Sequence, residues 1–139
     1  GSHASGFMPH RDGYGEQNML TRGQEIAVNV DEAEIVAMPL QSGEASLHNG
    51  RLAHSSQPNR SSDRRIGLSF NYMPTNTRQT LSDWDSAALV RGNDAYRHFA
   101  LTPRPERDFD PVSVEFHKKA ATIGRDIVYQ GAEKVRDTY

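Results

Sequence analysis

The chain has no cysteine, and its 139 residues include a single tryptophan. Without cysteine it can form neither a disulfide framework nor a thiolate metal site. No apolar run approaches the ~20 residues of a membrane-spanning helix, and no signal-peptide pattern is evident. The formal net charge is only −2, which does not favour a nucleic-acid or anionic-membrane partner. These absences fit a cytoplasmic protein, although a chain without cysteine is also compatible with export.

The length suits one domain over residues 1–139. Residues 11–24 are polar and rich in glycine, which predicts a loop. Short apolar runs between turn formers predict a mainly β chain, with core strands within about residues 25–75. An Asp-Pro entry and apolar residues at three- and four-residue steps predict a helical tail over about residues 112–136. The expected strands lie at residues 25–30, 34–40, 45–54 and 65–72.

The stretch from Leu47 to Pro74 is the most informative part of the chain. From Arg65 to Tyr72 polar or small residues alternate with large apolar ones, which is typical of a half-buried strand. His54 precedes Arg65 by eleven residues, across a connection rich in turn formers. A neutral imidazole suits iron, zinc or copper, and a guanidinium suits a carboxylate. Antiparallel strands here would direct both groups into one pocket.

These residues resemble a known family. The run GEASLHNGRLAHSSQPNRSSDRRIGLSFNYMPTNTRQT is similar to the second half of the phytanoyl-CoA dioxygenase family of iron(II)- and 2-oxoglutarate-dependent oxygenases. The opening GSHASGFMPH is similar to the family's Gly-Ser-His segment, although Gly-Ser-His is also a common remnant of expression tags. The resemblance implies a double-stranded β-helix, or cupin-like jelly roll. About half of its eight core strands are expected in this chain, with a helix at the C-terminal end.

By resemblance, His54 is the distal histidine of the iron-binding two-histidine-one-carboxylate triad, and Arg65 holds the far carboxylate of 2-oxoglutarate. Ser56 matches a position that contacts the co-substrate. Asn59 belongs to the same His-x-Ser-x-x-Asn run and is expected to support the site from outside the ligands; the simpler alternative is that it shapes the connection through an Asx turn. The alternatives to these roles are a hydrogen-bonded structural histidine, an ordinary salt bridge of Arg65 and a turn serine. The other two iron ligands are expected upstream of the residues in this chain.

Two further histidines are candidates. His48 precedes His54 by six residues and would share its face in an unbroken strand, where it could orient the ligand, but Asn49-Gly50 interrupts the run. His10 and Asp12 form an H-x-D pattern that with His54 would complete a triad within the chain. No apolar alternating strand leads into that pattern, and a motif of two fixed positions occurs often by chance. His117 is expected on the surface of the tail helix.

The resemblance implies an oxygenase that uses Fe(II), 2-oxoglutarate and O2 to hydroxylate a C–H bond of a small-molecule substrate. A halogenase of the same superfamily and a non-enzymatic cupin-like binding module are the alternatives. The loop at residues 11–24 and the region around Trp84 are expected to shape the substrate pocket. Neither region identifies the substrate.

Overall fold

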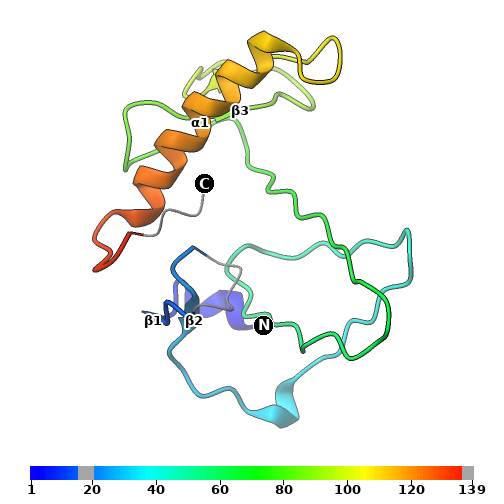
Figure 1. Ribbon diagram of the computed structural model, residues 1–139. Coiled ribbons are helices and arrows are strands. Elements are labelled where there is room, and N and C mark those ends of the chain that lie inside the picture. Colours follow the sequence, from blue (N-terminus) through cyan, green and yellow to red (C-terminus); the bar gives the residue numbers. More distant parts are fainter. Residues whose placement is uncertain (16–20, 136–139) are drawn as a thin grey trace. The chain divides into compact units, whose positions relative to one another are not determined.

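The computed structural model describes residues 1–15 and 21–135 (Figure 1). The chain divides into two compact units, Gly1–Asn71 and Tyr72–Tyr139. In the first unit the elements are η1 (Ser2–Ser5), β1 (His10–Asp12), β2 (Gln24–Ile26) and η2 (Glu32–Glu34); in the second they are β3 (Ser86–Ala87), β4 (Ala100–Leu101) and α1 (Pro111–Tyr129). None of the helices in these ranges has the length and apolar character to cross a membrane.

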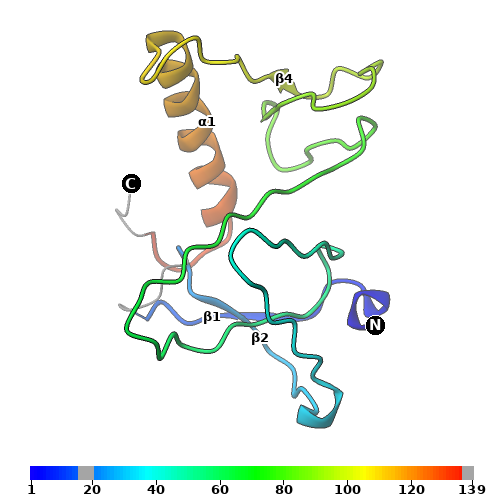
Figure 2. The same ribbon diagram turned by 90° about the vertical axis from the view of Figure 1, so that its right-hand side faces the viewer.

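An antiparallel hairpin joins β1 and β2 in the first unit (Figure 2). Arg11 faces Glu25 across the pair, and its Nη2 lies 3.0 Å from the Glu25 carboxylate. Beyond β1 the Gly13 amide donates to the Gly23 carbonyl at 3.1 Å, and a Cβ added at Gly13 would meet that same oxygen at 3.1 Å. The prediction of a loop over residues 11–24 is therefore wrong at the two ends of this range, which pair as strands. Residues 16–20 of the range lie outside the described residues.

Most of the expected core strands do not form. Only the strand expected at residues 25–30 has a counterpart, the shorter β2, and the described residues at 34–40, 45–54 and 65–72 contain no strand. The prediction was wrong there because alternation describes only the side chains, whereas a strand also needs a neighbouring backbone to pair with. The double-stranded β-helix stays a prediction: the described chain holds two two-stranded sheets and one α-helix.

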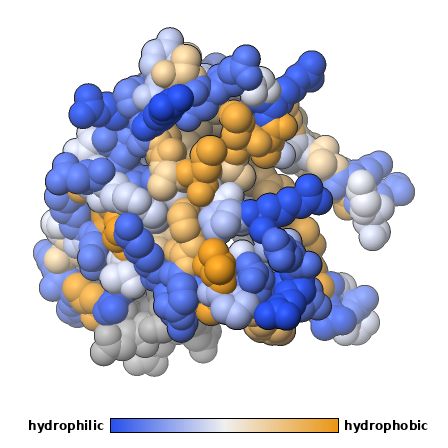
Figure 3. Space-filling view, turned by 90° about the horizontal axis from the view of Figure 1, so that it is seen from above, coloured by the Kyte–Doolittle hydropathy of each residue, from blue (hydrophilic) through white to orange (hydrophobic). Residues whose placement is uncertain are grey.

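The apolar face of the expected strand at 65–72 is exposed. Ile66, Leu68 and Phe70 are 74%, 82% and 70% exposed, so alternation here does not correspond to burial. Figure 3 shows apolar side chains at the surface among polar ones on the visible face. Within the described residues, the buried hydrophobic set consists of Tyr129 alone.

Local turns agree with the sequence. The run Gln41-Ser42-Gly43-Glu44 consists of residues typical of turns, and there the Glu44 amide donates to the Gln41 carbonyl at 3.0 Å while Gly43 takes a φ of 89° that favours glycine. At the Asn49-Gly50 interruption the Leu52 amide donates to the Asn49 carbonyl at 2.9 Å. The interruption is therefore a tight turn.

The second unit is built on α1 and a short parallel pair, β3 with β4. Asp110 caps α1, since its carboxylate accepts from the Ser113 amide at 3.3 Å and from the Ser113 hydroxyl at 2.9 Å. Pro111 occupies the first turn, so the Asp-Pro entry is confirmed. The helix ends at Tyr129, earlier than expected, because Gly131 follows with a φ of 73° and leaves the helical path.

The predicted stripe of α1 faces the rest of this unit. Phe116, Ala120, Ile123 and Ile127 are all partly buried, and His117 is exposed as expected. The Phe116 ring lies 5.7 Å from that of Trp84, and Lys119 Nζ lies 4.2 Å from the Trp84 centroid. Trp84 therefore fastens its segment to the helix, whereas its expected role beside a substrate stays a prediction.

We expect Asp110→Ala to lower the free energy of unfolding by about 1 kcal/mol, because it leaves helical amides at the start of α1 without their acceptor. Urea denaturation followed by far-UV circular dichroism measures this loss. Asp108→Ala is the matched control, since it removes an exposed carboxylate just before the cap. Equal losses in the two variants would contradict the capping role.

Candidate functional site

The sequence-predicted site residues His48, His54, Ser56, Asn59 and Arg65 all lie in the first unit, on the turn at 49–52 and the connection that follows it. His54 Nδ1 lies 2.7 Å from the Leu52 carbonyl oxygen. A carbonyl only accepts, so Nδ1 carries the proton and donates it. In the neutral ring Nε2 then has the free lone pair, which is the form a metal requires.

His48 contacts the His54 ring, with the ring centroids 4.9 Å apart and the planes tilted by 52°. Strand periodicity had suggested that the two histidines share one face of a strand. They do not, because no strand forms here. The turn between them brings them together: Asn49 accepts from the Leu52 amide through its carbonyl and from the Arg51 amide through its side chain, each at 2.9 Å. The His48 ring therefore lies beside the His54 ring.

Arg65 and Ser56 are in direct contact. Arg65 Nη1 donates to Ser56 Oγ at 3.1 Å, which joins the two ends of the connection between His54 and Arg65. Within residues 1–15 and 21–135 Arg65 forms no ion pair, so the salt-bridge alternative does not describe it. A guanidinium has five N–H donors, and this one is exposed, so a planar edge remains for a carboxylate.

Asn59 organises the middle of the connection. Its Oδ1 accepts from the Ser61 amide at 3.1 Å and from the Ser61 hydroxyl at 2.8 Å, and its Nδ2 donates to the Asp63 carbonyl at 2.6 Å. These bonds close an Asx-type turn, as the sequence indicated. The turn shortens the path between Ser56 and Arg65 and so favours their contact.

His10 and Asp12 do not join His54 in a metal site. The Asp12 carboxylate accepts from Arg22 Nε at 2.9 Å, from Arg22 Nη2 at 2.6 Å and from the Tyr14 hydroxyl at 3.0 Å. The hydrogen bond from Arg22, ahead of the opposing effect of desolvation, holds the pKa of Asp12 below its ordinary value. No group of three potential metal-binding His, Asp or Glu side chains occurs in the part of the chain that the structure describes.

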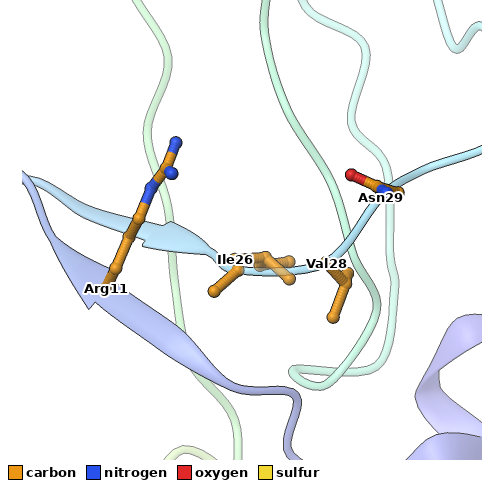
Figure 4. Close-up of a pocket in the computed structure, with 5 residues that line it drawn as sticks. Arg11, Ile26, Val28 and Asn29 are labelled. Atoms are coloured by element: carbon orange, nitrogen blue, oxygen red, sulfur yellow. The ribbon is translucent and has the colours of Figure 1, made fainter.

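A depression of about 210 Å³ lies beside the hairpin, lined by Arg11 of β1 and by residues 26–29 at the end of β2 and beyond it (Figure 4). Arg11, the charged group in its lining, is already bonded to Glu25. None of the predicted site residues lines this depression. It therefore adds nothing to the candidate site.

Two contacts that no sequence pattern predicted join the start of the chain to the site. Ser2 Oγ accepts from the Ala53 amide at 2.9 Å, across 51 positions of sequence. The Arg51 guanidinium lies 4.7 Å from the centroid of the Phe7 ring. Only the resemblance of both segments to one family hinted that they belong together.

We expect Arg22→Gln to raise the pKa of Asp12 toward its ordinary value of 3.8. Because the folded pKa is lowered, the Asp12–Arg22 pair stabilises the hairpin above pH 3.8, and this contribution is lost as the pH falls through the folded pKa. A pH titration of the Asp12 carboxyl ¹³C resonance measures the shift. Arg11→Gln, whose partner is Glu25, is the control and should leave Asp12 unchanged.

Residues 1–67 match the sequence model of the family described as phytanoyl-CoA dioxygenase (PhyH). The matched range contains every residue of the candidate site and ends before the second unit. The resemblance inferred from the sequence is thus confirmed over these residues. No curated protein and no solved structure matches the chain.

Proposed function

We propose that this chain, whose residues 1–67 match the phytanoyl-CoA dioxygenase family, acts as an Fe(II)- and 2-oxoglutarate-dependent oxygenase that hydroxylates a C–H bond of a small-molecule substrate. The observation that carries the proposal is the contact between Arg65 and Ser56 at 3.1 Å, on the same connection as His54. It places the two residues proposed to bind the co-substrate side by side, close in sequence to the proposed metal ligand.

His54 is proposed to bind the metal through Nε2. The donation from Nδ1 to the Leu52 carbonyl supports this choice of atom, because it keeps the proton off Nε2 in the neutral ring. A histidine with its other nitrogen bonded to a backbone carbonyl is the usual arrangement of a metal ligand. His48 is proposed to limit rotation of the ring from its side contact.

Arg65 is proposed to hold the distal carboxylate of 2-oxoglutarate, with Ser56 beside it. Ser56 supports the arginine in two ways: its oxygen accepts from Nη1 and fixes the plane of the guanidinium, and its own proton remains for a carboxylate oxygen. Charge-assisted pairs of this kind are stronger than neutral hydrogen bonds. Asn59 contributes by holding the connection in its turn.

The residues fit part of an iron site. His54 offers the nitrogen ligand that Fe(II) accepts, whereas a complete set of three ligands is not present among the described residues. In this family the metal supplies oxygen activation: one atom of O2 enters the substrate C–H bond, the other enters succinate, and CO2 leaves 2-oxoglutarate. The part proposed for this chain is to bind and orient the co-substrate and to supply one ligand of the metal.

The proposal predicts the behaviour of an anaerobic Fe(II) titration in the presence of 2-oxoglutarate, followed by the visible charge-transfer absorption of the chelate. His54→Ala should abolish the absorption. Arg65→Ala should weaken 2-oxoglutarate binding roughly 10- to 100-fold, from the ~1.5–3 kcal/mol of hydrogen bonds to charged groups, and a high 2-oxoglutarate concentration should restore the signal. Arg65→Lys should recover part of the affinity, since it keeps the charge and loses the fork.

Arg64→Ala is the matched control, because it removes an exposed guanidinium one residue away and leaves the Ser56 contact intact. It should titrate as the unchanged chain does. Absence of the absorption in a native protein that carries all three proposed iron ligands would overturn the oxygenase proposal and favour the binding-module alternative. If Arg64→Ala and Arg65→Ala weakened 2-oxoglutarate binding equally, Arg65 would have no specific role in it.

A further inference from the structure

The peptide unit between Leu52 and Ala53 is bonded on both sides. Its carbonyl accepts from His54 Nδ1 at 2.7 Å, and its amide donates to Ser2 Oγ at 2.9 Å. The two bonds share one planar group, because the C–N bond of a peptide does not rotate freely. Whatever fixes the amide therefore also fixes the direction of the carbonyl.

We propose that Ser2 is a positioning residue for His54, acting through this shared peptide. The inference deepens the proposed function and rests on it for the metal-binding role of His54. Ser2, Leu52 and Ala53 are all partly buried, so water competes less for these groups than at an open surface. The chain of bonds runs from the serine oxygen through the peptide to the imidazole, and successive hydrogen bonds of this kind strengthen one another.

A second contact holds the same two segments together. The Arg51 guanidinium lies 4.7 Å from the Phe7 ring centroid, within the range of a cation–π interaction. It joins the residue before Leu52 to the segment just after η1. The start of the chain thus touches the turn at two points, Ser2 on the shared peptide and Phe7 on the preceding side chain.

Removing the Ser2 hydroxyl leaves the Ala53 amide without its acceptor in a partly buried position. The peptide is then free to turn toward another partner, which takes the Leu52 carbonyl away from His54. Nδ1 loses the bond that retains its proton, and the neutral ring shifts toward the Nε2–H form. That form presents a proton where the metal should bind.

Long-range ¹H–¹⁵N NMR of the neutral imidazole rings, on the full metal-free chain, tests the proposal. The unchanged chain should show His54 mainly as the Nδ1–H tautomer, and Ser2→Ala should lower that fraction at least twofold. Ser2→Thr keeps the hydroxyl and should restore it. Ser5→Ala, which removes an exposed hydroxyl from the same short helix, is the control and should have no effect.

Calorimetric titration with Ni²⁺ alone gives a second measurement. Ser2→Ala should weaken binding roughly tenfold, the lower end of the loss caused by altering outer partners of metal ligands, and Ser2→Thr should recover it. His54→Ala identifies the part of the binding that depends on this ring. A tautomer change without His54-dependent Ni²⁺ binding would support Ser2 as positioning His54 and overturn the metal-binding role.

A tautomer fraction and a Ni²⁺ affinity in Ser2→Ala within the error of Ser5→Ala would overturn the proposal. If Ser2→Ala does not fold, Ser2→Cys decides instead. That variant replaces the hydroxyl that accepts from the Ala53 amide by a thiol, which is a weaker acceptor, and it should lower the Nδ1–H fraction of His54. An unchanged fraction in a folded Ser2→Cys would count against the positioning role.

Discussion

The tight turn at residues 49–52 is the constraint on which the candidate site depends. Asn49 closes it twice, with its backbone carbonyl and with its side chain. The reversal of direction brings His48 against His54 and leaves the Leu52 carbonyl where His54 Nδ1 reaches it. A straight strand would have placed the two histidines six residues apart along one face, too far for their rings to touch.

The connection after His54 is also held in its conformation by short polar contacts rather than by a hydrophobic core. Asn59 closes the middle of the connection, and the bond between Arg65 and Ser56 joins its ends. Such contacts fix local geometry well, yet each contributes only about 1 kcal/mol because water competes for the same groups. This is consistent with a first unit in which the apolar residues after Arg65 stay exposed.

In the second unit, apolar contacts of the helix accompany the polar ones. Its α-helix is capped by Asp110, and the partly buried side chains on one stripe of the helix include Phe116, which meets Trp84. The family match ends at residue 67, so none of this unit contributes to the argument for the oxygenase. Its helix was nonetheless the best predicted element, since a cap, a first-turn proline and a periodic stripe all lie within one continuous stretch of sequence.

The sequence by itself determined the features that depend on neighbours a few residues away. These are the turns at 41–44 and 49–52, the Asx turn of Asn59 and the start of α1, because side chains of Asn, Asp, Gly and Pro act on the adjacent backbone. Only the tertiary structure decided which segments pair as strands and that Ser2 bonds to the peptide before His54. Alternation predicts an apolar face but does not identify the segment that pairs with it. A hydrogen bond between residues 51 positions apart produces no periodic pattern in the sequence.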